Sequence, residues 1–363
     1  MRKSISGQSS YAIAAVLYSL PFALYMSFCF TLDIRVIAFI FIALTFLSLL
    51  LKTAIITSQV FAFLPILYVF AQFGVFSGIV SFLIGAMAFF ILLKLPISKY
   101  INTHISASIT LALAFCATAL FTTDYFGIGA TGTTVYEIMR SYRYLGFHAN
   151  WRGVLYGTIT LVIMITYPRA FKKLKSFIPA PAVALAAPYI LNLFLNPNIA
   201  TTYINEPINI YYGLPLFSPL SALGLFYSFL GGLAFALLLQ IYKDKDSGIF
   251  YGAPKLHSTS YKPENLNFYF ALLYALFMIA LTFLLKSVFI RIPLHSMAVV
   301  PIVAAWQSVK WKGIAAAFRH GFISWLLAVL TFGLILVFNA AVCILFAFLI
   351  SAVYSGVLIW QKK

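Results

Sequence analysis

Residues 322–360 read FISWLLAVLTFGLILVFNAAVCILFAFLISAVYSGVLIW and contain no charged side chain. The hydrocarbon core of a bilayer is about 30 Å thick, so one α-helix needs about 20 apolar residues to cross it. This run is therefore long enough for two membrane spans, with a turn near Asn339. We take it as the stretch that decides the fold, because no soluble domain contains such a run on its surface.

The composition of the whole chain points the same way. Of its 363 residues, 63% are hydrophobic and 9% are charged, whereas a soluble domain averages about 45–50% and about 25%. This excludes a soluble globular protein. The net charge of +17 would suggest nucleic acid as a partner in a soluble protein, but in a membrane protein it is first a topology signal. We expect the lipid bilayer as partner and no nucleic acid.

Apolar runs continue along the chain and predict an all-α polytopic membrane protein with about twelve spans in a single transmembrane domain, residues 1–363. The first run lacks a small-residue cleavage site and is expected to be a retained span. The predicted spans are 11–32, 36–51, 54–71, 73–93, 104–122, 153–167, 177–195, 219–241, 267–285, 293–307, 322–338 and 340–360.

The basic residues test this arrangement. If the spans alternate from a cytoplasmic N-terminus, 18 of the 24 Lys and Arg residues fall on the cytoplasmic side, as the positive-inside rule requires. The other six are Arg35, Arg140, Arg143, Arg152, Lys286 and Arg291. Both termini are then cytoplasmic, and we expect a bacterial inner (plasma) membrane.

The loop after residue 122 contains two motifs. Gly127, Gly129 and Gly132 have GxGxxG spacing, but no strand precedes them, so a flexible loop is favoured over a dinucleotide site. Thr134 and Glu137 have capping-box spacing and open an apolar stripe, which predicts an interfacial helix at about 134–145.

Three arginines accompany this helix. Arg140, Arg143 and Arg152 could form an outer basic rim that attracts anions. The alternative is an ordinary surface helix whose arginines face water.

Candidates for chemistry inside the membrane are few. All seven acidic residues are assigned to loops, among them Asp124, and the three cysteines lie in apolar runs without paired spacing. We therefore expect no metal, no cofactor and no enzyme activity. His295, near the start of a span, is the best candidate for a titrating group. A hydrogen-bonded interfacial histidine is the alternative.

Several segments together resemble the SulP (sulfate permease) family of anion transporters. They are YSLPFA at 18–23, the run 85–122, GVLYGTITL at 153–161, YPR at 167–169, FIPAPAVAL at 177–185, GLPLFSP at 213–219, and IPLHSMA at 292–298 with the run that continues to Trp360. The resemblance implies a UraA-type fold of two inverted seven-span repeats. It also implies an anion site between the N-termini of two half-helices, the third and tenth spans, where free N–H groups favour negative charge.

The chain departs from the family pattern in three places. Only the 25 residues from 242 to 266 separate the match to the eighth span from the match to the eleventh, so we expect an incomplete fold that lacks two core spans. Thr57, Ser58 and Gln59 stand where the family tends to open its third half-helix with a Gly-Pro pair. Only residues 361–363 follow the last span, so no STAS domain is expected.

The resemblance implies a secondary transporter of a small inorganic anion such as sulfate, bicarbonate or chloride. We expect Thr57, Ser58 and Gln59 to bind the anion through hydroxyl, amide and backbone donors. Two alternatives stay open. A degenerate scaffold would bind a partner protein, either a second copy as a homodimer or another membrane protein. A nucleobase permease would normally keep intramembrane carboxylates, which the predicted spans lack.

Overall fold

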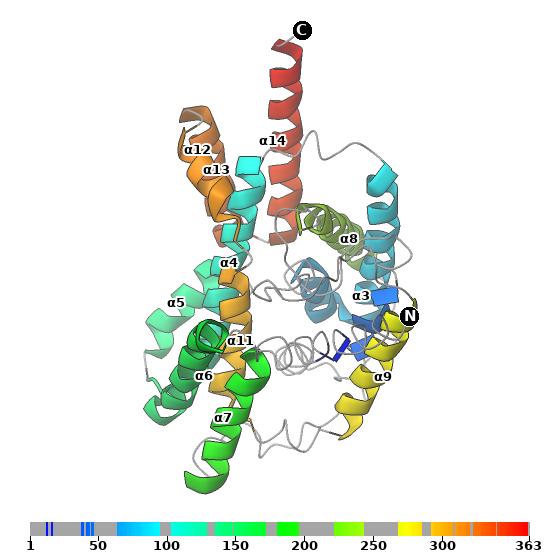
Figure 1. Cartoon of the computed structure of the whole chain (residues 1–363). Helices are drawn as coiled ribbons and strands as arrows, with labels where there is room; N and C mark the ends of the chain where they lie inside the picture. Colours follow the sequence, from blue (N-terminus) through cyan, green and yellow to red (C-terminus); the bar gives the residue numbers. More distant parts are fainter. Residues whose placement is uncertain are drawn as a thin grey trace.

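In the computed structural model, most of the described residues form helices. It describes residues 12, 13, 16, 38, 39, 41–43, 45, 46, 64–94, 103–128, 135–146, 148–171, 180–195, 221–242, 268–284, 292–307, 309–319, 322–338 and 340–361. The helices are α3 (Leu64–Lys94), α4 (Thr103–Phe126), α5 (Val135–Leu145), α6 (Trp151–Ala170), α7 (Ala180–Leu195), α8 (Ala222–Tyr242), α9 (Phe268–Leu284), α11 (Leu294–Gln307), α12 (Trp311–Arg319), α13 (Phe322–Val337) and α14 (Ala340–Gln361) (Figure 1).

The described part of the chain contains no strand, which agrees with the predicted all-α class. Three helices are long and apolar enough to cross a membrane, at Ile105–Phe126, Trp151–Ala170 and Ala222–Ile241. Shorter apolar segments lie within α3, α7, α9, α11, α13 and α14. The number of spans and their sides therefore stay predictions, although each predicted run from 104 onward coincides with a helix.

Helix α3 corrects the expected boundary between spans 54–71 and 73–93. The helix runs through residue 72 and breaks instead at Gly74, whose φ of 86° and ψ of 175° are not helical. Glycine reaches positive φ without a steric penalty, so the chain changes direction here without a loop. The first ten residues of the predicted span 54–71 lie outside the described residues.

Helix α12 was not expected, because residues 308–321 were taken as a loop with three basic residues. The segment forms nine residues of helix with Trp311 and Lys312 exposed and Ile314 and Ala316 half-buried. Its charges break up the apolar run, and about two and a half turns are too few for the helical period to be recognised in the sequence.

The helices form two groups (Figure 1). The first contains α3 and α8, which pack along each other, with α9 on the same side. The second contains α4, α6, α11 and α13, with α5, α7 and α12 on its outside. Helix α14 contacts members of both groups. Relative motion of two such groups is therefore resisted by α14 and by any side chain that crosses between them.

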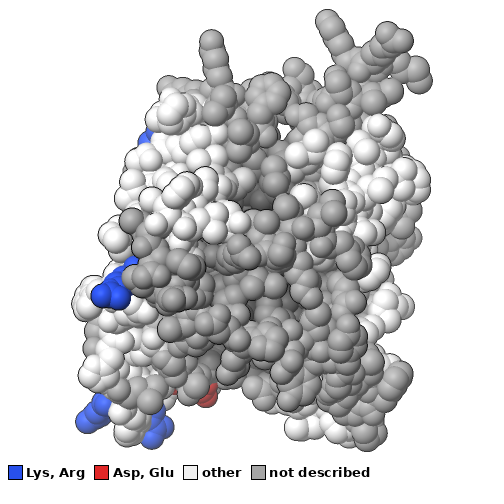
Figure 2. Space-filling view, turned by 90° about the horizontal axis from the view of Figure 1, so that it is seen from below, with Lys and Arg blue, Asp and Glu red and all other residues white. Residues whose placement is uncertain are grey.

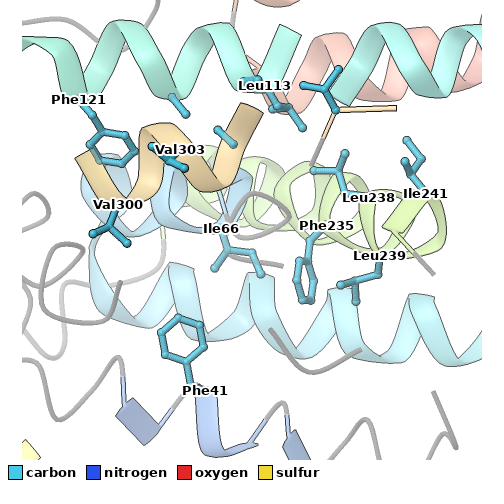
Figure 3. Packing of buried hydrophobic residues seen from close by; sticks show 14 of the residues in the cluster. Phe41, Ile66, Leu113, Phe121, Phe235, Leu238, Leu239, Ile241, Val300 and Val303 are labelled. Carbon is cyan, nitrogen blue, oxygen red and sulfur yellow. The ribbon is translucent and has the colours of Figure 1, made fainter. Parts of the chain in front are cut away.

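Buried apolar side chains fill each group and the space between them (Figure 3). Phe121 of α4 lies beside Val300 and Val303 of α11, while Phe235 and Leu239 of α8 point toward α3. Each is at most 8% exposed. Burying a side chain of this size stabilises a fold by roughly 1.5–3 kcal/mol when the alternative is water.

Small residues let α3 and α8 approach closely. A Cβ atom on Gly232 would lie 2.6 Å from the Ser81 carbonyl oxygen and 2.9 Å from the Gly85 nitrogen. Both neighbours are backbone atoms, so neither can move aside. Inside a membrane, helices associate through van der Waals packing and not through the hydrophobic effect, and small residues permit the close approach that this packing needs.

Candidate functional site: the start of α3 and the buried polar groups

The expected anion-binding residues Thr57, Ser58 and Gln59 lie outside the described residues. The structure does describe the helix that follows them, α3, from Leu64 onward. Helix α3 is therefore the described element that lies closest in sequence to the predicted site.

The first part of α3, from Leu64 to the break at Gly74, is packed against α8. Pro65, Ile66 and Val69 are buried. A Cβ atom on Gly231 would lie 2.8 Å from Val69 Cγ2 and 3.3 Å from the Pro65 carbonyl oxygen. A short helix held this tightly gives its N-terminal N–H groups a fixed direction, as an anion site requires.

Hydroxyl groups line the contact between α3 and α8, which we call the serine seam (Ser77, Ser81 and Ser228). All three are buried. Ser228 Oγ lies within hydrogen-bond distance of two carbonyl oxygens, that of Ser77 at 2.9 Å and that of Gly224 at 2.6 Å, which share its one hydrogen. Ser81 Oγ has no hydrogen-bond partner among the described residues. Sequence reasoning missed this seam, because a serine every few residues in an apolar run is common.

A second set of polar groups surrounds His295 at the start of α11. Its side chain is 1% exposed, and neither ring nitrogen has a hydrogen-bond partner among the described residues. Ser296 is fully buried, and within the same described part its Oγ also lacks a partner. The titrating histidine and the hydrogen-bonded histidine both stay predictions.

Two glycines make room for this imidazole. A Cβ atom on Gly153 would overlap the His295 ring, and one on Gly127 would lie 2.9 Å from Nε2. Gly127 also has a φ of 67°, which disfavours other residues. The structure thus shows what two glycines of the quoted motifs do. They let α4, α6 and α11 meet around His295.

The N-terminus of α6 reaches the same place. Asn150 caps the helix by accepting a hydrogen bond from Gly153 N–H at 3.2 Å, which satisfies one of the free donors of the first turn. Asn150 N–H in turn donates to the Phe126 carbonyl oxygen at 2.9 Å. The start of α6 is thereby fixed to the end of α4, beside His295.

The three predicted rim arginines are all exposed. Arg140 and Arg143 lie on α5, and Arg152 lies in the first turn of α6. Arg140 has a ring partner, since its guanidinium carbon is 5.9 Å from the centre of the Tyr144 ring. Anion attraction by this rim stays a prediction.

One acidic group, Asp124, acts on α5, the helix that carries two of the rim arginines. Asp124 was assigned to a loop, but it lies in the last turn of α4. Burial raises the pKa of Tyr142 on α5, and the negative charge of Asp124 raises it further. Ile138 of α5 is buried, so part of the stripe assigned to the interface packs against the protein instead. Thr134, the predicted cap, lies outside the described residues.

Most of the described surface carries no charge. On the face drawn in Figure 2, the described Lys and Arg residues lie along one edge, and most of the other described atoms belong to uncharged residues. Large apolar side chains are exposed on several helices, including Leu83, Met87 and Ile91 of α3. A soluble protein rarely exposes so many, whereas lipid-facing helices do.

Comparison with known proteins shows the fold. No family model and no curated protein matches the chain. The solved transmembrane domain of a cyanobacterium bicarbonate transporter, BicA, has a similar structure with a TM-score of 0.61 and 15% sequence identity, and the match covers 98% of both chains. At 15% identity the match shows a similar fold, and the family resemblance of the quoted segments stays a prediction.

The expected loss of two spans falls on residues 243–266, which lie outside the described residues, and the 98% coverage of both chains gives it no support. The chain is an integral membrane protein with the fold of a transporter's transmembrane domain.

Proposed function

We propose that the chain is a secondary transporter of a small inorganic anion, namely bicarbonate, sulfate or chloride. The observation that carries this proposal is the likeness in fold to a bicarbonate transporter over 98% of both chains. Bicarbonate is therefore the first substrate to test. Fold alone does not fix a substrate, so the site must supply the rest of the argument.

The site we propose is formed by Thr57, Ser58 and Gln59 with the backbone N–H groups that follow. Residues 64–93 contain no charged side chain, so the anion would be held by neutral donors and by the helix dipole. Ser81 of the serine seam supports this proposal, because its hydroxyl lies close to the start of α3: a Cβ atom on Gly231 would be 2.9 Å from Ser81 Oγ and 3.3 Å from the Pro65 carbonyl oxygen. Neutral donors suit a transporter, since the anion must also be released.

The test is uptake of labelled bicarbonate, sulfate and chloride into proteoliposomes that contain the purified protein. The Ser58→Leu, Gln59→Leu double variant should lose saturable uptake. Thr166→Leu is the matched control, because Thr166 is exposed on α6 and its hydroxyl bonds only the Val162 carbonyl oxygen of its own helix. This variant should transport like the original protein.

Two results would overturn the proposal. Absence of flux for all three anions, from protein that elutes as a folded species, would leave the scaffold alternative. Flux that survives the double substitution would keep transport but remove Thr57, Ser58 and Gln59 as the site. In that case the serine seam would be examined next.

A further inference from the structure

The turn between α11 and α12 is fixed to α4. Trp306 Nε1 donates to Thr118 Oγ1 at 2.9 Å, and the Lys310 backbone N–H donates to Thr110 Oγ1 at 3.3 Å. The rings of Trp306 and Trp311 stack with their centres 6.0 Å apart across the turn. Trp306, Lys310 and Trp311 are therefore held in the second helix group.

The side chain of Lys310 leaves this group and reaches the first one. Its Nζ donates to the Ile241 carbonyl oxygen at 2.9 Å. Ile241 lies in the last turn of α8, which ends at Tyr242 and packs along α3. One lysine thus connects the α3–α8 pair to the α4–α11 pair.

The chemistry of this contact is favourable. The last carbonyl groups of a helix have no partner within the helix and carry the negative end of its dipole. An ammonium group at this position makes a charge-assisted hydrogen bond, which is stronger than a neutral one. Lys310 is half-buried and Ile241 is buried, so solvent screens the contact only partly.

We propose that Lys310 is a latch that stabilises the observed arrangement of the two helix groups. The proposal rests on the proposed function, because alternating access requires one group of helices to move against the other. Lys310 stays with α4 in such a motion, whereas Ile241 stays with α8. The Lys310–Ile241 hydrogen bond must therefore break when the groups separate.

A static role makes a different prediction. If Lys310 only ends α8 or only orients the chain in the membrane, its removal lowers stability without changing the relative position of the two groups. The two roles are separated by measuring that position directly. The measurement does not need a transported substrate.

The test uses double electron–electron resonance between spin labels at Leu223 of α8 and Phe322 of α13, which are exposed by 60% and 70%. The three native cysteines are first replaced by alanine. Lys310→Met keeps the aliphatic stem and removes the charge. We expect a second distance population, with the ratio of the two populations changed about tenfold, as for loss of a hydrogen bond to a charged group.

Three further variants complete the design. Lys310→Arg should keep the original distribution. Lys312→Met, which removes an exposed charge two residues further along the chain, in α12, should also keep it. Thr110→Val removes the hydroxyl that holds the Lys310 backbone. It should shift the distribution in the same direction as Lys310→Met, and it serves as the test if Lys310→Met does not fold.

An unchanged distribution in a folded Lys310→Met protein, or in Thr110→Val where Lys310→Met does not fold, would overturn the latch. An equal shift in Lys312→Met would also overturn it, because the effect would then follow net charge. A shift in Lys310→Met without anion flux in the original protein would support the latch and count against the proposed function. Anion flux in the original protein, without a shift in Lys310→Met, would support the proposed function and overturn the latch.

Discussion

Gly153 shows how one missing methyl group decides a contact between distant parts of the chain. The imidazole of His295 occupies the space that a Cβ atom would take, and Gly127 approaches the same ring from α4. The sequence places Gly127, Gly153 and His295 in separate motifs, but it does not predict that the imidazole contacts both glycines. This contact depends on how α4, α6 and α11 cross, which no local sequence pattern predicts.

Gly153→Ala should lower the free energy of unfolding by about 1–3 kcal/mol, because an overpacked site must shift its neighbours. The midpoint of thermal unfolding in detergent measures the effect. Gly333→Ala is the control, since a Cβ atom there meets nothing within 4 Å. It should leave stability unchanged or raise it by up to about 1 kcal/mol. Equal stability of the two variants would contradict the observed packing of His295.

At the scale of elements, long apolar runs predict helices well because a membrane leaves the backbone few alternatives. The run 322–360 divides where expected, into α13 and α14 with Phe338 and Asn339 between them. Helix α12 was missed because it is short and amphipathic. The predicted boundary at residue 72 differs from the break at Gly74, because a glycine can change the direction of the chain without a polar loop that would mark the position in the sequence.

The packing of α3 on α8 allows a test on two glycines of one helix. Gly232→Ala would place Cβ 2.6 Å from a backbone oxygen, while Gly224→Ala would place it 3.0 Å from the Ser221 hydroxyl, which can rotate. Gly232→Ala should therefore lower the unfolding midpoint clearly more than Gly224→Ala. The reverse order would show that the two helices cross elsewhere.

At the scale of the whole molecule, the described helices form two groups joined by α14 and by Lys310. The sequence predicts the all-α membrane class, because composition and hydropathy report the solvent around the fold, whereas the family resemblance depends on the short segments quoted above. It does not predict how the helices divide into two groups. From the sequence, Lys310 is expected only to be a basic residue of a cytoplasmic loop, and its contact with α8 is not predicted. The predicted anion site lies outside the described residues and stays a prediction.

The predicted orientation of the chain can be checked on intact cells. Single cysteines at Ser4 and Gln361, in a background without native cysteines, should resist a membrane-impermeant maleimide until the cells are permeabilised. A cysteine at Arg143, which is exposed on α5, should react at once. Labelling of Ser4→Cys in sealed cells would reverse the assignment of every loop.

The serine seam also has a consequence for biosynthesis. Ser77 and Ser228 are 151 positions apart in the chain, so at 5–20 residues per second α3 is made roughly 8–30 s before its partner. During that interval α3 is already inserted, but α8 is not yet present to cover the hydroxyl groups of Ser77 and Ser81. The cell must protect this half-finished surface at the translocon, and a ribosome that pauses between the two helices would lengthen its exposure.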